Sequence, residues 1–444
     1  MSTPVWQWLP GCTEPVLVAE LSRLPAAGGA RWVYAPGYSE RADALAPDPV
    51  HLRLTRSSRG LRLTASDGLP GVLRDAAPAG YGADRLDAAA GRTLAPLERL
   101  ELGPADGVGA LEACRDVERK LTWRPHDLDD LAVLAAGLAE QAPASRAVRQ
   151  LLDDAATSAG GERPKVTVRD GHRWWLAKMA DRGDLPDLPA KEFVTMRLLA
   201  QLNGQPDIRT PEVRLVRCGA HAVYLIERFD RMVSAGHPAA APTRRAYASA
   251  HTVLGLNLEA LAGDVRRSYL VFADEMARWM RGSPFALADR QELWRRMAAN
   301  ALLGNVDDHP RNHGLLWQDG GWRLCPAFDV TPVAQQAPVV LRMAVHLDGA
   351  AEASVERLLQ SAPHFGVEIG AAADWLGRKS NFIAEQFEAE LRAVGVPELG
   401  IAAVRCAYCM ALGIATAPGG VKDAAARVAD QAAKRQRRGA RFSR

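Results

Sequence analysis

Hydrophobic and polar residues alternate near the N-terminus and give way to helical spacing further along the chain. The stretch HLRLTRSSRGLRLTAS (51–66) contains two LRLT runs separated by a polar break, which predicts a β-hairpin. Between residues 68 and 114, Gly and Pro repeatedly interrupt a helical period, which predicts short helices joined by tight turns. We therefore expect a β-containing N-terminal domain over residues 1–110.

The middle of the chain predicts a mixed α/β lobe, because strand-like alternation and helical spacing follow each other closely. Helical spacing predicts helices over 127–141, 145–155 and 190–203. Period-two stretches predict strands over 164–169, 172–179, 211–218 and 221–230, with an Asp-Gly turn between the first two. These elements define a second domain over 111–232.

Beyond residue 232 the pattern becomes mainly helical, and we expect a third domain over 233–444. Periodic apolar positions predict helices over 256–262, 268–280 and 288–303. The C-terminal stretch AKRQRRGARFSR (433–444) has six basic residues and no acidic one. Such a run is typical of a solvated, frayed tail, and the competing interpretation is a contact to the phosphate backbone of DNA.

The composition narrows the function classes. Of the 444 residues, 48% are hydrophobic and 24% are charged, and a formal net charge of +3 does not make nucleic acid or an acidic membrane the default partner. Six cysteines are too sparse for a disulfide scaffold, and neither a leader pattern nor a long apolar window is present. We expect a cytoplasmic protein with no membrane partner.

Cys406 and Cys409 have CxxC spacing without further ligands, which favours a packed helix with two buried cysteines over a zinc site.

The densest polar cluster, GNVDDHPRN (304–312), follows an apolar helix end. Asp307 and Asn312 are five residues apart, and Asp329 follows a short predicted hairpin in an apolar, strand-like context. In phosphoryl transfer on a kinase scaffold, a loop Asp accepts the proton of the nucleophile, an Asn five residues later binds one Mg²⁺, and a later Asp binds the other. Carboxylate and amide oxygens are the ligands that Mg²⁺ prefers. The spacing therefore predicts a kinase-type site.

The preceding lobe offers groups that would bind phosphates. The loop SAGGERPK precedes a strand, so its backbone N–H groups are candidates to cover phosphates, although Gly-Gly before a strand is more often only a turn. The candidate residues of this loop are Ser158, Gly160, Gly161 and Lys165. Lys178 ends the apolar strand WWLAKM and suggests an ion pair or an anionic ligand, with Glu192 on the next helix as its natural partner. This order matches the plan of a kinase N-lobe.

Together with GLPGVLRDAAPAGYGADRL, GVGALE, KEFVTMRL, ERFDR and AFDVTP, these motifs resemble the HipA family of toxin serine/threonine kinases. The resemblance covers most of the chain. It implies an α+β, bilobal protein-kinase-like fold with a mixed α/β N-lobe, a mainly helical C-lobe and an N-terminal accessory domain. The implied activity is that of an ATP- and Mg²⁺-dependent serine/threonine protein kinase, the toxin of a bacterial type II toxin–antitoxin pair.

The resemblance also implies roles for individual residues. Asp307 is expected to be the catalytic Asp, with Asn312 and Asp329 as the Mg²⁺ ligands. Nucleotide contacts are expected from Lys178, Glu192, Glu227, Phe229, Asp230 and His309. In the hinge ERFDR, Glu227 and Phe229 are expected to contact adenine through backbone groups, and Asp230 to lie near the nucleotide.

In the family, autophosphorylation of a serine in the Gly-rich loop ejects this loop and inactivates the kinase. Ser158 is the matching position, and Thr157 is the adjacent alternative. A phosphate of about −1.5 to −2 charge beside the phosphates of ATP would be repelled, which explains such a switch. Glu162 departs from the small residue usual in the family, and an acidic side chain there would repel ATP unless it points away.

The partner implied by the resemblance is a small helix-turn-helix antitoxin that binds operator DNA, with the toxin joining as co-repressor and the basic tail as one route to DNA. The expected substrate is a translation-related protein. In the family it is an aminoacyl-tRNA synthetase, the glutamyl enzyme, but substrate choice depends on surfaces that the motifs do not define. Two alternatives stay open: a catalytically weak pseudo-kinase that acts as co-repressor, and a kinase whose acceptor is a small molecule or lipid.

Overall fold

The computed structural model describes residues 2–24, 29–65, 67–140, 163–181, 183–219, 221–233, 236, 241–256, 263–335 and 337–442. The chain divides into two compact units, each built from separated segments. Unit 1 contains Met1–Pro189, Pro211–Ala260 and Gly314–Cys325, and unit 2 contains Ala190–Thr210, Leu261–His313 and Pro326–Arg444. The predicted domain boundaries at residues 110 and 232 stay a prediction.

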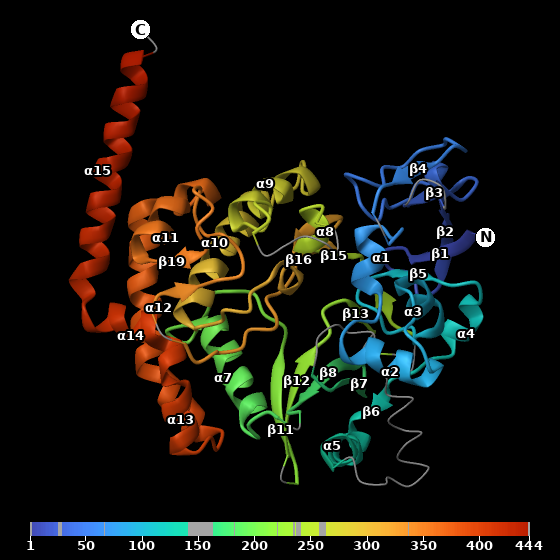
Figure 1. Cartoon of the computed structure of the whole chain (residues 1–444), viewed down its shortest axis with the longest axis horizontal. Helices are drawn as coiled ribbons and strands as arrows, with labels where there is room; N and C mark the ends of the chain where they lie inside the picture. The colour runs from blue at the N-terminus through green and yellow to red at the C-terminus, as the bar shows by residue number, and fades with distance from the viewer. Residues whose placement is uncertain are drawn as a thin grey trace. The chain divides into compact units, whose positions relative to one another are not determined.

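The first sheet of unit 1 confirms that the N-terminal part contains β-structure, but its strands differ from the prediction. Its five antiparallel strands have the order β4-β3-β2-β1-β5 (Figure 1). Their bounds are β1 Ser2–Trp8, β2 Pro15–Arg23, β3 Ala30–Tyr34, β4 Leu61–Leu63 and β5 Leu111–Ala113. The predicted hairpin over 51–66 is wrong: the described residues 52–55 form no strand, and β4 pairs with β3 instead.

Short helices follow these strands, as the Gly and Pro pattern predicts. They are α1 Gly71–Ala76, α2 Tyr81–Ala90, α3 Pro96–Leu102 and α4 Val117–Leu121. Helix α3 begins with Pro96, and the carboxylate of Glu98 accepts a hydrogen bond of 2.8 Å from the backbone N–H of Ala95. Gly91 ends α2 in the left-handed conformation, with φ of +65°.

The second sheet of unit 1 has the strand order β11-β12-β8-β7-β6. Its strands are β6 His126–Asp127, β7 Lys165–Asp170, β8 Arg173–Met179, β11 Val213–Cys218 and β12 His221–Glu227. Strands β7, β8 and β11 agree with the predicted strands to within two residues, and β12 ends three residues before the predicted end at residue 230. Helix α5, Leu131–Glu140, packs Leu131 and Leu134 onto the core that Val166, Trp175 and Val223 form. The predicted helix over 145–155 lies outside the described residues.

Smaller elements complete unit 1. The pair β13 Arg231–Met232 and β14 Thr243–Arg244 leads into a three-stranded sheet and α8 Ala250–Val253. The sheet contains β15 Tyr247–Ser249, β16 Gly314–Gln318 and β17 Gly321–Leu324. Strands β16 and β17 form the short hairpin that was expected before Asp329.

Unit 2 is mainly helical, as predicted. Its helices are α7 Leu188–Ala200, α9 Tyr269–Trp279, α10 Ala286–Leu302, α11 Val355–Ser361, α12 Ile369–Ala393, α13 Glu398–Val404, α14 Cys409–Thr416 and α15 Pro418–Phe442. The predicted helices over 268–280 and 288–303 correspond to α9 and α10. The predicted helix over 190–203 ends earlier, because β9 Gln201–Leu202 turns back to pair with β10 Gln205–Pro206. Most of the predicted helix over 256–262 lies outside the described residues.

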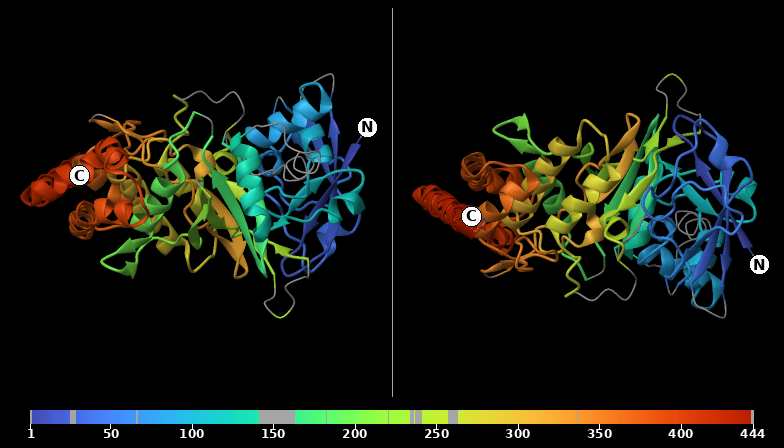
Figure 2. Two further views of the ribbon diagram at one scale, coloured as in Figure 1. Left: turned by 90° about the horizontal axis from the view of Figure 1, so that it is seen from below. Right: turned by 90° about the horizontal axis from the view of Figure 1, so that it is seen from above.

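The core of unit 2 lies between α10 and α12. Trp294 of α10 and Trp375 of α12 meet edge to face, with ring centroids 5.6 Å apart. Helices α11, α12 and α15 lie side by side, as Figures 1 and 2 show. Helix α10 also packs against α9 and α14, and its C-terminal end leads into the polar cluster at 304–312.

The C-terminal prediction needs two corrections. The basic stretch is not a frayed tail, because the backbone is helical to Phe442 in α15. Cys406 is exposed and Cys409 is partly exposed, so the helical prediction is right but the predicted burial of both cysteines is wrong. Cys406 lies in a turn before α14 that is buried through Ala407 and Tyr408, and α14, which begins at Cys409, is buried through Ala411 and Ile414.

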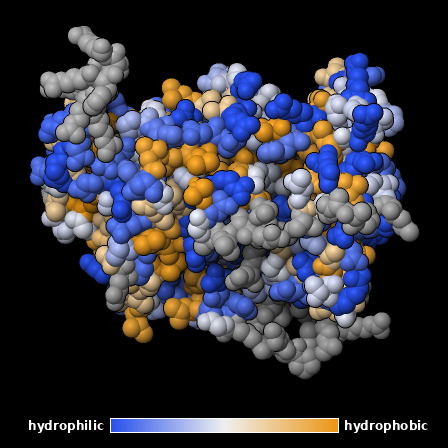
Figure 3. Space-filling model, turned by 45° about the horizontal axis from the view of Figure 1, so that its top comes forward, coloured by the Kyte–Doolittle hydropathy of each residue, from blue (hydrophilic) through white to orange (hydrophobic). Residues whose placement is uncertain are grey.

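Among the described residues, one stretch, Glu398–Thr416, is long and apolar enough to cross a membrane by length and composition alone. The structure divides it into α13, the 3-10 turn η5 Arg405–Tyr408 and α14, and Ile401, Ala407 and Tyr408 are buried in unit 2. Hydrophilic and hydrophobic residues are interspersed over the face drawn in Figure 3. The cytoplasmic location stays a prediction.

Candidate functional site

A tight turn after α10 starts the polar loop. Gly304 has φ of +66°, and a Cβ atom there would overlap the backbone carbonyl of Ala407. Its own carbonyl accepts a hydrogen bond of 3.0 Å from the backbone N–H of Val333. Only glycine fits this turn without strain, so the sequence Gly-Asn at 304–305 fixes where the loop leaves the helix.

The loop holds Asp307 and Asn312 together. The carboxamide Nδ2 of Asn312 donates to the backbone carbonyl of Asp307 over 3.0 Å, and the N–H of His309 donates to the same carbonyl over 2.8 Å. The Asp307 side chain is 61% exposed, whereas Asn312 is buried. Asp307 is therefore accessible to a substrate, while Asn312 is fixed.

Asp329 differs from the strand-like context expected for it. The described residues 326–335 form no strand, and Asp329 has φ of +59°, in the left-handed region. The backbone N–H of Ala327 donates to Arg209, and that of Thr331 donates to the side chain of Asn305, so the segment follows the loop instead of a sheet. A non-glycine residue in this region is uncommon and marks a position worth a functional hypothesis.

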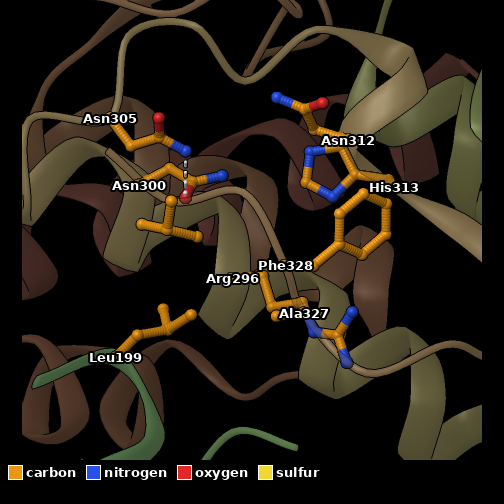
Figure 4. A pocket seen from close by; sticks show the side chains of 9 residues that line it. Leu199, Arg296, Asn300, Asn305, Asn312, His313, Ala327 and Phe328 are labelled. Atoms are coloured by element: carbon orange, nitrogen blue, oxygen red, sulfur yellow. Dashed lines mark hydrogen bonds between the residues drawn. The ribbon is translucent and has the colours of Figure 1, made fainter. Parts of the chain in front are cut away.

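A pocket brings these segments together (Figure 4). Its lining residues come from α7, α10, the polar loop and the segment of Asp329: Leu199, Arg296, Asn300, Asn305, Asn312, His313, Ala327, Phe328 and Val330. Phe328 and Val330, the chain neighbours of Asp329, share this pocket with Asn312. Asp329 itself does not line the pocket, and its predicted pairing with Asn312 stays a prediction.

Below the loop lies a buried polar cluster that the sequence did not reveal. The hydroxyl of Tyr269 donates to Oδ2 of Asp308 over 2.6 Å, accepts from Nδ2 of Asn300 over 2.8 Å, and lies 3.1 Å from Nε2 of His313. Asp308 and Tyr269 are fully buried. In the sequence, only the position of Asp308 beside Asp307 points to a function for it.

Burial sets the charge states in this cluster. It raises the pKa of the Asp308 carboxyl to about 7 and lowers the pKa of the His313 imidazole to about 3, with Arg296 adding to the second effect. It also raises the pKa of the Tyr269 hydroxyl well above its usual value. The imidazole is thus neutral at physiological pH, and the tyrosine remains a hydrogen-bond donor.

Glu192 connects α7 to the segment of Asp329. Its side chain is buried, and Oε1 accepts a hydrogen bond of 3.0 Å from the hydroxyl of Thr331. This bond connects the start of α7 to a residue two positions after Asp329. Its predicted pairing with Lys178 stays a prediction.

In unit 1, two predicted phosphate-binding residues lie directly opposite each other. Lys165 of β7 and Lys178 of β8 are antiparallel partners, so their side chains extend from the same face of the sheet. The predicted contact of this pair to phosphates stays a prediction.

The hinge segment follows β12. Glu227 ends this strand, and its backbone N–H donates to Glu212 over 2.9 Å. Phe229 packs on Tyr247 with ring centroids 6.1 Å apart. The carboxylate of Asp230 is buried and accepts from Arg228, from Arg231 over 2.6 Å and from the N–H of Gly109 over 2.8 Å. These contacts occupy its oxygens, and its predicted place near a nucleotide stays a prediction.

The structure describes only some of the remaining predicted site residues. Ser158, Gly160, Gly161 and the alternative Thr157 lie outside the described residues. His309 is described, and its Nδ1 is buried without a hydrogen-bond partner. The predicted Gly-rich loop therefore stays a prediction.

The donor set suits Mg²⁺. Among the described residues, no group of three or more His, Cys, Asp and Glu side chains is placed to hold a metal ion. Asn312 and Asp329 offer one amide and one carboxylate, which are hard oxygen ligands. Mg²⁺ is typically bound by one or two carboxylates together with water and substrate phosphates, so these two side chains fit it.

Comparisons with known proteins show the family and the fold of this chain. Residues 157–393, slightly more than half of the chain, match the family of HipA-like C-terminal domains. A search of curated proteins finds no match. The HipA toxin of Shewanella oneidensis MR-1, solved with HipB and its operator DNA, has 17% identity and a TM-score of 0.62, covering 90% of this chain and 94% of that chain.

A second solved structure, the proinflammatory kinase CtkA of Helicobacter pylori, has 14% identity and a TM-score of 0.35, covering 56% of this chain and 94% of that chain. The likeness to the Shewanella protein shows the fold. The chain has the predicted mixed α/β, protein-kinase-like architecture with a β-containing N-terminal part.

Proposed function

Because this chain belongs to the HipA family through its HipA-like C-terminal domain, we propose that it is an ATP- and Mg²⁺-dependent serine/threonine protein kinase acting as the toxin of a bacterial toxin–antitoxin pair. The supporting observation is the contrast within one loop: the Asp307 carboxylate is exposed, and the Asn312 carboxamide is held against its backbone. A base must reach its substrate, whereas a metal ligand must be fixed.

In the proposed reaction, the Asp307 carboxylate accepts the proton of the acceptor hydroxyl. The acceptor oxygen forms a bond to the γ-phosphorus, and the bond from this phosphorus to the bridging oxygen breaks, with its electron pair remaining on ADP. Asn312 and Asp329 would hold Mg²⁺, which neutralises phosphate charge when bound. Asp307 thus serves as base and orients the acceptor.

Lys165 and Lys178 are the proposed phosphate contacts of unit 1, because they lie in register on one face of the sheet. The backbone of Glu227 and Phe229 is the proposed contact to adenine. Glu192 is the proposed partner of Lys178, and the loop with Ser158, Gly160 and Gly161 is proposed to cover the phosphates. Ser158, with Thr157 as the alternative, is the proposed autophosphorylation site.

The proposed partners are a helix-turn-helix antitoxin and operator DNA, and the proposed substrate is a translation-related protein. The Shewanella HipA was solved together with HipB and its operator DNA, which supports such an assembly for this chain. The basic stretch supports a direct contact to DNA, because its six positive charges follow the packed half of α15.

The kinase proposal is tested by incubating the purified protein with Mg²⁺ and radiolabelled ATP, alone and with a cell lysate. We expect label on a protein that disappears in Asp307→Asn and persists in the matched control Asp348→Asn, whose carboxylate is also exposed in unit 2. Intact mass and peptide mapping should place any self-modification at Ser158 or Thr157. Absence of protein labelling by an unphosphorylated, ATP-binding sample would contradict the proposal, and label in an organic-soluble product would indicate a small-molecule or lipid acceptor.

The DNA contact is tested by the salt dependence of binding to operator DNA together with the antitoxin. Replacing Lys434, Arg435, Arg437 and Arg438 by Gln should lower the slope of log K against log salt by roughly 3 to 4, about 0.9 for each lost phosphate contact. The control Lys422→Gln, on the packed half of α15, should leave the slope unchanged. An unchanged slope in the fourfold variant would exclude the stretch as a DNA contact.

A further inference from the structure

A short segment that follows β18, Val339–Val340, lies against the polar loop of unit 2. Leu341 and Met343 are buried, whereas Val340 and Arg342 are exposed. The two buried residues anchor the segment, and the Arg342 side chain is exposed. Arg342 is thus presented from a fixed backbone.

Backbone hydrogen bonds hold this segment on both sides. The N–H of Leu341 donates to Ala351 over 3.0 Å, and the N–H of Ala344 donates to Arg267 over 2.8 Å. The N–H of Tyr269 at the start of α9 donates to Ala344 over 3.0 Å. The backbone on both sides of Arg342 is therefore fixed to neighbouring elements.

The bond at Arg342 itself comes from the buried cluster. The backbone N–H of Arg342 donates to Oδ1 of Asp308 over 2.7 Å, while Oδ2 of Asp308 accepts from the hydroxyl of Tyr269 over 2.6 Å. Asp308 directly follows Asp307 in the chain. One buried carboxylate therefore fixes the backbone of Arg342 relative to the proposed catalytic base.

The guanidinium of Arg342 reaches that base. Its Nε lies 3.5 Å from Oδ1 of Asp307, and the two side chains are 58% and 61% exposed. An exposed ion pair contributes little to folding, so stability does not explain the arrangement. A cation held beside an exposed carboxylate restricts the rotamers of that carboxylate, and a base must lie within hydrogen-bond distance of the hydroxyl it deprotonates.

From this geometry we infer that Arg342 is a positioning residue for Asp307, and that Tyr269 acts through Asp308 to hold Arg342 in place. The inference rests on the proposed kinase function. In this role, Arg342 orients the Asp307 carboxylate before the acceptor hydroxyl binds. Misplacement of a catalytic group by about 1 Å can lower turnover by about 100-fold, so the effect belongs to kcat.

The test measures steady-state phosphate transfer by the full-length protein. We expect Arg342→Gln to lower kcat by roughly 10- to 100-fold and to leave the KM for ATP within about 2-fold. Arg342→Lys should recover part of the loss, because the ammonium keeps the positive charge. The matched control Arg278→Gln removes an equally exposed arginine of unit 2 that pairs with Glu275, and it should stay within about 2-fold of wild type.

Tyr269→Phe tests the second half of the inference. The substitution removes the hydroxyl that is bonded to Asp308. It should lower kcat when it is made in the wild-type protein but not when it is added to Arg342→Gln, because both changes act on one contact. Equal fractional losses in both backgrounds would overturn the action of Tyr269 through Arg342. A kcat of Arg342→Gln within about 3-fold of wild type, or a loss confined to the KM for ATP, would overturn the role of Arg342. If the wild type transfers no phosphate, the proposed function fails and the inference with it.

Discussion

Gly304 shows how much a single residue determines in the site. Its positive φ and the nearby carbonyl of Ala407 leave no space for a side chain, and its carbonyl anchors Val333. Gly320, in the turn between β16 and β17, has φ of +77° but open space around it. Comparing the two glycines therefore distinguishes the cost of a side chain at positive φ from the cost of a steric overlap.

We predict that Gly320→Ala lowers the free energy of unfolding by about 1–2 kcal/mol, because an L-residue is strained at positive φ. Gly304→Ala should lower it by about 1–3 kcal/mol more, because the new methyl group also overlaps backbone atoms. Urea denaturation of both variants measures the difference. Equal losses would show that the turn after α10 moves freely to accommodate the methyl group.

At the scale of elements, Lys379 connects α12 to the end of α7. Its buried ammonium donates to the carbonyl of Leu199 over 2.9 Å, to the carbonyl of Gln201, and to Asp207 over 3.3 Å. Burial lowers the pKa of Lys379 to about 8, although the charge of Asp207 opposes this shift. The buried ammonium thus bonds one carbonyl in the last turn of α7 and one in β9.

This pKa predicts a pH dependence. Lys379 has a folded pKa below its unfolded value of about 10.4, so between about pH 8 and 10.4 the unfolded chain binds more protons. The free energy of unfolding should therefore rise with pH across this window, by roughly 1–3 kcal/mol. Chemical denaturation as a function of pH measures the rise, which Lys379→Met should abolish. A rise that persists in the variant would assign it to other groups.

The sequence pattern predicted those elements whose partners are close in the chain. Strands β7 and β8 followed from alternation across an Asp-Gly turn, since both strands are neighbours in the chain. The hairpin over 51–66 failed because β4 finds its partner in β3, about 30 residues earlier, where Trp32 is fully buried. Strand pairing between distant segments leaves no local signal.

The same distinction applies to the site. The spacing of Asp307 and Asn312 is local, and the structure connects the two through one hydrogen bond. Tyr269 and Asp308 are 39 residues apart, and their contact depends on how α9 packs against the loop. Asp329 was placed correctly after the hairpin, but its left-handed conformation depends on contacts to Asn305 and Gly304 that alternation does not encode.

At the scale of the whole molecule, a buried ionic network joins the N-terminal segments of unit 1 to its hinge. Arg228 bonds both Asp106 and Asp230, and Arg231 donates to Gly107 over 2.7 Å. Although burial opposes ionisation, the charges of Arg228 and Arg231 hold the pKa of Asp230 below its usual range. The Asp230 carboxylate thus connects residues that are more than 100 positions apart in the sequence.

We predict that Asp230→Asn lowers the free energy of unfolding by about 3–5 kcal/mol, because it removes one of the two carboxylates that neutralise the buried guanidinium groups and leaves only Asp106. The loss should persist in 0.5 M NaCl, since salt screens buried pairs weakly. The control Asp43→Asn, which breaks an exposed pair with Arg41, should show a small loss that salt reduces. A salt-sensitive loss in Asp230→Asn would contradict the burial of this network.

The division of the chain into interleaved segments has a consequence for its synthesis. Strands β16 and β17, which complete the β15 sheet of unit 1, leave the ribosome 125 residues after Pro189, roughly 6–25 s later at about 5–20 residues per second. Until then β15 has no partner strand, and unit 2 lacks its longest helices. An interrupted translation product that ends before Gly314 therefore contains neither unit complete, so a ribosome that stalls early releases no folded toxin.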